Sequence, residues 1–376
     1  MTKLYTNISG LCRFCCFALL VIIIAPLSSN AQMGTPSVGG YSENPGNALR
    51  SGETLQDLLE GSFGAPMAAD AFTTIQRSKT YRLTKLDNRL TGKAIAVEQV
   101  KESIIDELLD TIKTEAKAGR NVSKKIYGKS EGISYELLPA REDIMVILRS
   151  IISFEQTEEN WGRGKLKLKA KTRFALEQVL PLITAIRGNQ KVFSEISMVR
   201  SLATDAMNEI IQIQKGKASG SKTALNQRYL DATHRLIATD WFEKARYFSF
   251  SSKHQQAIDA YSKAIENSPG LAAAYRNRGA LYAGYLKDSS KAVSDFVQAY
   301  SNDAIDHMES REFEACIEDT SAALKLYEDY ARAYYQRAAC RIGLGQQKNV
   351  KTDLVKAAQL GHKPAQDMLA SKGMTW

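Results

Sequence analysis

The chain has 376 residues, of which 44% are hydrophobic and 24% are charged, and its formal net charge is +9 at pH 7. These proportions exclude a wholly disordered chain, a collagen-like repeat and a membrane protein with many spans. The length favours two or three domains, and the presence of only 4 His and 5 Cys leaves little material for metal sites.

Residues 1–31 have the features of a secretory signal peptide. The segment contains two cations and no acids, and its apolar run is too short for a comfortable membrane span. Small residues at Ser29 and Ala31 fit the positions that a signal peptidase reads, so we expect cleavage after Ala31 and no transmembrane span in the mature chain. The alternative is a retained N-terminal anchor. Cleavage would leave Cys316 and Cys340, too few cysteines for a disulfide framework.

A flexible linker is expected over residues 32–66, which begin with a stretch rich in Gly, Ser, Pro and Asn. Apolar residues then recur at helical spacing over residues 92–117. Periodicity and turn residues next predict a small α+β module, with a helix at 141–148, a strand at 150–159, a Gly turn at 161–164, a strand at 165–173 and a helix at 176–186. A long helix over 190–214, a break at 216–221 and a helix from Thr223 follow.

The second strand of the predicted hairpin alternates strictly between cations and small or apolar residues. One face carries Lys165, Lys167, Lys169, Lys171 and Arg173. Such a row suits an anionic polymer, for example an acidic glycan or lipid headgroups. The interpretation that we favour is a solvated edge strand, whose lysines oppose aggregation and are partly neutralised by acids on the partner strand.

A helical repeat begins near residue 238. Its best-matched positions are Trp241, Ala245, Phe248, Ala257, Tyr261, Ala264 and Pro269 in the first copy, Tyr275, Gly279, Tyr282, Ala292, Phe296 and Ala299 in the second, and Tyr334, Ala338, Arg341, Val350, Leu354 and Ala357 in the fourth. The third copy starts early, so its first helix is short or merges with the preceding helix. One extra residue is expected near Asp288. The pattern resembles the tetratricopeptide repeat family, whose period is about 34 residues.

This resemblance implies a mostly α-helical protein, in which a C-terminal α-solenoid of about four helix pairs and a capping helix follows the small α+β module with its β-hairpin. The predicted domains are a signal peptide (1–31), a linker (32–66), the α+β module (67–189), connecting helices (190–237) and the repeats with their cap (238–376). By repeat matching, the exposed groove positions that would bind a partner are Phe242, Arg246, Arg276, Asn277, Arg332 and Tyr335.

The hairpin region is also similar to the N-terminal module of bacterial envelope proteins that carry such repeats. The shared features are a strand ending near Trp161, a Gly turn, the basic strand and a downstream helix. The two resemblances imply an exported protein, located in the periplasm, associated with the outer membrane or secreted. They favour a non-catalytic scaffold that binds a protein or peptide in the concave groove. The alternative is an envelope-surface binder that uses the basic strand on anionic glycan or lipid.

No catalytic motif is apparent. The chain has no Gly-rich phosphate loop, no GxSxG and no HExxH. We therefore expect no enzyme activity, no cofactor, no metal site and no nucleic-acid partner, and an enzyme with a site in the N-terminal half is the least favoured hypothesis. We expect Cys316 and Cys340 to be reduced thiols packed between helices, because Cys316 stands where the repeat needs a small apolar residue.

Overall fold

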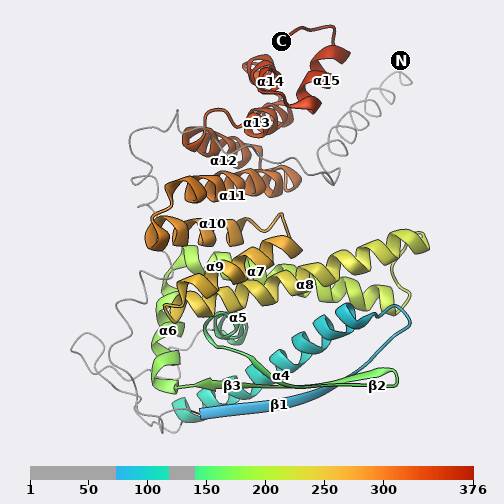
Figure 1. Ribbon diagram of the computed structural model, residues 1–376, viewed down its shortest axis with the longest axis vertical. Helices are drawn as coiled ribbons and strands as arrows, with labels where there is room; N and C mark the ends of the chain where they lie inside the picture. Colours follow the sequence, from blue (N-terminus) through green and yellow to red (C-terminus); the bar gives the residue numbers. More distant parts are fainter. Residues whose placement is uncertain (1–72, 118–139) are drawn as a thin grey trace, which may run out of the picture. The chain divides into compact units, whose positions relative to one another are not determined.

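The computed structural model describes residues 73–117 and 140–376 (Figure 1), so the predicted signal peptide and linker lie outside the described residues. The described chain is mostly helical and contains one three-stranded antiparallel sheet, which confirms the predicted fold class in its coarse form. It divides into two compact units, and the division falls between Asn302 and Asp303. Residue 238, where the sequence analysis places the start of the repeats, lies inside one continuous helix.

The sheet comprises β1 (Thr73–Arg82), β2 (Glu155–Gly162) and β3 (Lys165–Phe174), in the order β1-β3-β2. The predicted hairpin of β2 and β3 is confirmed. The prediction that the basic strand is an edge strand is wrong, because β1 pairs with its other side. The sequence analysis missed β1, whose only buried residues are Ile75 and Tyr81. It also began β2 too early, since residues 150 and 151 belong to the preceding helix.

Five helices pack with the sheet in the first unit: α4 (Arg89–Lys117), α5 (Arg141–Ile151), α6 (Leu176–Gly188), α7 (Gln190–Gln214) and α8 (Lys222–Phe250). Helix α4 lies across one face of the sheet, where Leu166 and Leu168 of β3 are buried (Figure 1). The predicted break at 216–221 is confirmed. Helix α8 begins after it, because the Ser221 hydroxyl accepts a hydrogen bond from the Ala224 backbone N–H at 3.2 Å.

The same unit continues with α9 (His254–Asn267), α10 (Ala272–Leu281), the π-helical turn η3 (Tyr282–Leu286) and the part of α11 (Ser289–Glu309) up to Asn302. The residue predicted to be extra near Asp288 is accommodated here. A π-helical turn takes up one residue more than an α-helical turn, and Lys287 then adopts a left-handed conformation with φ of 54°. Helix α11 is continuous, which agrees with the second of the two alternatives given for the third copy, a first helix that merges with the preceding helix.

The second unit contains α12 (Phe313–Leu326), α13 (Ala331–Gly343), α14 (Val350–Gln359) and α15 (Lys363–Ser371). Helix α15 coincides with the predicted capping helix. The prediction of two free thiols is wrong, because Cys316 of α12 and Cys340 of α13 form a disulfide. Both residues are fully buried and their Cα atoms are 6.2 Å apart, within the ordinary range for a disulfide.

One set of polar contacts occurs once in each unit. An arginine on the first helix of a pair holds an aspartate on the second through two hydrogen bonds, reaches a serine on the preceding helix and lies over a tyrosine ring. The members are Ser262, Tyr275, Arg278 and Asp295 in the first unit, and Ser321, Tyr334, Arg337 and Asp353 in the second. The arginine and aspartate are 17 residues apart in the first set and 16 in the second. The difference of one residue equals the residue that η3 takes up, and the same contact set is therefore found in both units.

Candidate functional site

Three of the six predicted groove residues meet at a single carboxylate. Glu195 of α7 accepts hydrogen bonds from Arg246 Nη1 of α8 at 3.0 Å and from Asn277 Nδ2 of α10 at 2.9 Å. Arg276 Nη1 of α10 forms an ion pair with the other oxygen of Glu195 at 3.4 Å. Two cations and one amide from two helices therefore surround one acid, which is the donor set that recognises a carboxylate.

Glu195 is held at this position because the apolar side of helix α7 packs against α8 and α9. Val199 and Leu202 of α7 belong to the apolar cluster that contains Phe242 of α8 and Tyr261 of α9. The Phe242 and Tyr261 rings meet edge to face, with centroids 5.6 Å apart. The prediction that Phe242 and Arg246 are exposed is wrong, since they are 1% and 2% exposed. The reason is that α7 packs along α8 on the side where sequence matching placed an open groove.

Arg246 differs from the other donors of this site because it is buried and only part of its guanidinium is hydrogen-bonded. Its guanidinium is buried, and Nε and Nη2 have no hydrogen-bond partner within the described part of the chain. Burial lowers the pKa of Arg246, an effect that the carboxylate of Glu195 partly opposes. Buried donors without partners are uncommon in folded proteins and carry a free-energy cost.

The other two predicted groove residues lie on α13 of the second unit. Tyr335 is buried, contrary to the prediction of exposure, because it packs in the cluster that α13 forms with α14 and α15. Its ring lies 4.7 Å from that of His362. Arg332 is half-buried. Burial and the charge of Arg332 lower the pKa of His362 to about 4, so this histidine is neutral at neutral pH.

The basic strand presents its cations on the face of the sheet opposite to α4. Lys165, Lys167 and Arg173 are exposed, and Lys169 and Lys171 are half-buried. The predicted neutralisation by β2 is real at one position, since Lys171 Nζ lies 3.2 Å from Glu155.

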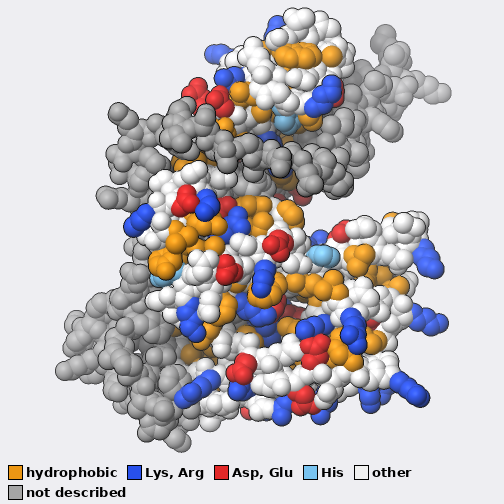
Figure 2. All heavy atoms as spheres, viewed as in Figure 1, with side chains coloured by type: hydrophobic (Ala, Val, Ile, Leu, Met, Phe, Trp, Pro, Cys, Tyr) orange, Lys and Arg blue, Asp and Glu red, His pale blue; other side chains and the backbone are white. Residues whose placement is uncertain are grey.

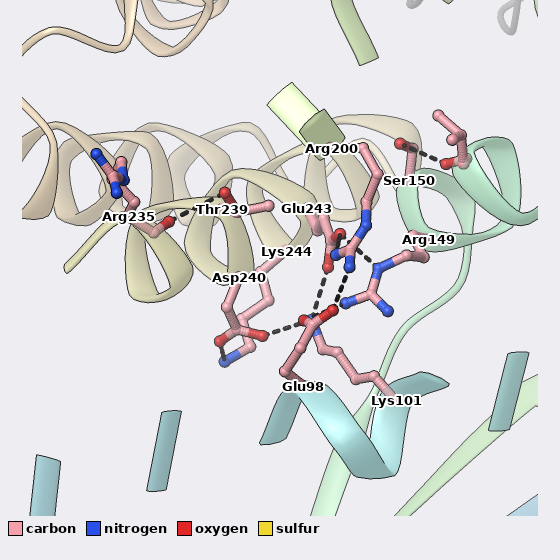
Figure 3. A network of polar contacts seen from close by, with 11 residues as sticks. Glu98, Lys101, Arg149, Ser150, Arg200, Arg235, Thr239, Asp240, Glu243 and Lys244 are labelled. Carbon is pink, nitrogen blue, oxygen red and sulfur yellow. Dashed lines mark hydrogen bonds and ion pairs between the residues drawn. The ribbon is translucent and has the colours of Figure 1, made fainter. Parts of the chain in front are cut away.

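A buried network of charges, which sequence analysis did not predict, joins α4, α5, α7 and α8 (Figure 3). Arg149 of α5 lies at its centre and donates hydrogen bonds to Glu243 at 2.9 Å and to Glu98 at 2.6 Å. Lys101 of α4 donates to Glu243 at 2.8 Å. The remaining ion pairs join Arg200 to Glu98 and to Glu243, Lys101 to Asp240, and Lys244 to Asp240.

Neighbouring charges shift the pKa of both Glu98 and Lys101 in favour of the charged form. Burial alone would raise the pKa of Glu98, but Arg149 and Arg200 outweigh it and lower the pKa to about 2. Burial would lower the pKa of Lys101, whereas Asp240 and Glu243 raise it above its ordinary value. Every carboxylate in the network is paired with at least two cations. We interpret the network as a structural junction of four helices.

The described residues contain no group of three or more His, Cys, Asp or Glu side chains that could hold a metal ion. Among the helices described, none is both long and apolar enough to cross a membrane. Comparisons with protein-family models, curated proteins and solved structures find no match to this chain.

Sequence reasoning missed Glu195 and the members of the charge network. Glu195 lies 51 residues before Arg246 in the chain, and Lys101 lies 142 residues before Glu243. A partial signal existed in α4, where Glu98 and Lys101 interrupt a helix side that is otherwise apolar. Charged residues in such a position need buried partners, although the pattern does not say which.

Proposed function

We propose that this chain is a non-catalytic interaction scaffold of the bacterial cell envelope, built from tetratricopeptide-type helix pairs, which binds a protein or peptide partner. The observation that carries the proposal is the convergence of Arg246, Arg276 and Asn277 on the Glu195 carboxylate. These donors lie on the first helices of successive pairs, α8 and α10, and in repeats of this kind the first helices line the binding surface.

The repeated contact set supports the repeat part of this proposal. Arg278 and Arg337 make the same bidentate contact with an aspartate and reach a serine in the same way, in two units of one chain. Gly279 supports it as well. A Cβ at this position would lie 3.1 Å from Asp295 Cβ and 3.3 Å from the Ala292 carbonyl oxygen. The small residue therefore permits the close approach of paired helices that the repeat requires.

The chemistry of the site indicates the kind of partner. A segment carrying a carboxylate, from a side chain or a C-terminus, would compete with Glu195 for Arg276 and Asn277, the two donors that are only partly buried. Charge-assisted hydrogen bonds of this type contribute about 1.5–3 kcal/mol each. The predicted export to the periplasm or cell surface is part of the proposal and depends on the signal-like residues 1–31.

Affinity capture from an envelope extract tests the proposal. The mature chain should retain a specific partner, identified by mass spectrometry, and the double variant Arg276→Glu with Asn277→Asp should lose it. The matched control is Lys222→Glu, which adds an acid at an exposed position in the same unit. Retention of the partner by the double variant at wild-type affinity would exclude this surface as the binding site.

A further inference from the structure

The outward face of the sheet carries a row of cations on β3, which includes Lys165 and Lys167. Because β3 is the central strand, its lysines do not protect an edge, and the edges of the sheet are β1 and β2. The other side of β3 is fixed by burial of Leu166, Leu168 and Ala170. Alternation then directs Lys165 and Lys167 to solvent. Figure 2 shows lysine and arginine side chains projecting along the lower edge of the view, where the strands lie.

The two neighbouring strands differ in charge along this face. The β1 residues in register with the cations are neutral and polar except for the last, and all are exposed: Thr74, Gln76, Ser78, Thr80 and Arg82. On the β2 side, Glu155 and Glu158 stand opposite Lys171 and Lys169. The half of the face near the β2–β3 turn has no acid, because Asn160 and Gly162 stand opposite Lys167 and Lys165.

Among the described residues, no acid compensates the cations Arg82, Lys165 and Lys167. No ion pair joins any of the three to a carboxylate within the described residues, whereas Lys171 is paired with Glu155. Three like charges on adjacent positions of two paired strands repel one another. A bound anion would remove this repulsion and use the hydroxyl donor of Thr80.

The positions of the cations and acids on this face favour a linear anion over a planar anionic surface. Alternate residues of a strand are about 7 Å apart, so the cations form a single straight row. A planar anionic surface would meet Glu155 and Glu158 as well as the lysines, whereas a linear polymer can follow β3 on its β1 side. The outward face contains no aromatic residue on which bases could stack, which disfavours single-stranded nucleic acid.

We propose that the outward face of the sheet binds a linear phosphodiester polymer of the poly(glycerol phosphate) type along β3, with its tightest contacts at Arg82, Lys165 and Lys167. Such a polymer has six backbone bonds per repeat and spans about 7 Å per phosphate when extended, by analogy with two residues of extended polypeptide. Its phosphates then match the spacing of alternate residues. This site is separate from the carboxylate site on α8 and α10 and does not depend on it.

Isothermal titration calorimetry of the full chain with poly(glycerol phosphate) tests the proposal. We expect Lys165→Gln with Lys167→Gln to weaken binding at least 10-fold. The matched control, Lys79→Gln with Lys191→Gln, removes the same charge from exposed positions, one on β1 facing the opposite side of the sheet and one on α7. It should change affinity less than twofold. The dependence of log Kd on log salt should become shallower by about one unit or more in the first variant only.

A loss of affinity can also result from misfolding, so a variant that is expected to bind more tightly is a second test. Glu158→Gln deletes an acid beside Lys169 and should tighten binding about twofold or more. Equal weakening in the test and control variants, or no binding by the wild-type chain, would overturn the proposal. So would tighter binding to vesicles of anionic phospholipid or to an oligothymidylate than to the polymer, because these outcomes would indicate a planar surface or a nucleic acid.

Discussion

Replacement of Arg149 by methionine should be among the most destabilising single changes in the first unit. The guanidinium is 4% exposed and lies between Glu98 and Glu243, to which it donates hydrogen bonds at 2.6 and 2.9 Å. Two charge-assisted bonds of about 1.5–3 kcal/mol each would be lost, and two buried carboxylates would lose a shared cation. Breaking a buried pair by removing one partner costs about 3–5 kcal/mol, and we expect a loss in that range.

Urea denaturation followed by tryptophan fluorescence measures this loss, because Trp161 and Trp241 lie in the same unit. The matched control is Arg141→Met on the same helix. Arg141 pairs with Asp106, and both side chains are more than 40% exposed. An exposed pair contributes about 0–1 kcal/mol, so the control should change stability little. Equal losses in the two variants would refute the interpretation of the network as a junction that depends on buried charge.

Four further outcomes are expected. The pKa of Glu98 is lowered from 4.5 to about 2; the free energy of unfolding should therefore be independent of this group above pH 4.5 and should fall as the pH drops towards 2, which urea titrations at several pH values would measure. Gly279→Leu should destabilise the first unit by about 1–3 kcal/mol or more in the same titration, because a Cβ already meets Asp295 at 3.1 Å. Thiol titration of denatured, unreduced monomer should find no free thiol at Cys316 or Cys340, and Cys316→Ser should lower stability by roughly 3 kcal/mol, since the bridge closes a loop of 24 residues. Glu195→Gln should raise partner affinity about 10-fold, measured by titration, because it weakens a competing contact within the chain; unchanged affinity would show that the partner binds elsewhere.

Local patterns predicted the elements whose signals lie within one segment. Helix α7 has the predicted bounds, since its buried residues recur at helical spacing between the cap at Asn189 and the glycine at 216. The alternation of Lys and Leu predicted β3. The spacing of repeat positions predicted the extra residue that became η3.

The missed features depend on contacts between distant segments. Strand β1 has a polar sequence and becomes a strand because β3 offers it a free edge. The burial of Arg246 follows from the packing of α7, which no pattern within α8 encodes. The pairing of Cys316 and Cys340 depended on Cβ geometry that spacing alone does not give.

Helix α8 should stay bound to the segments that precede it in the chain even after proteolytic cleavage at 216–221. Its middle and C-terminal half contribute Asp240 and Glu243 to the junction with α4 and α5, and Tyr229 near its start donates a hydrogen bond to Asp87 at 2.6 Å. A protease that cuts at 216–221 would sever the chain without separating these partners. The two pieces should therefore co-elute in gel filtration and melt as one species, like a protein assembled from two complementary fragments.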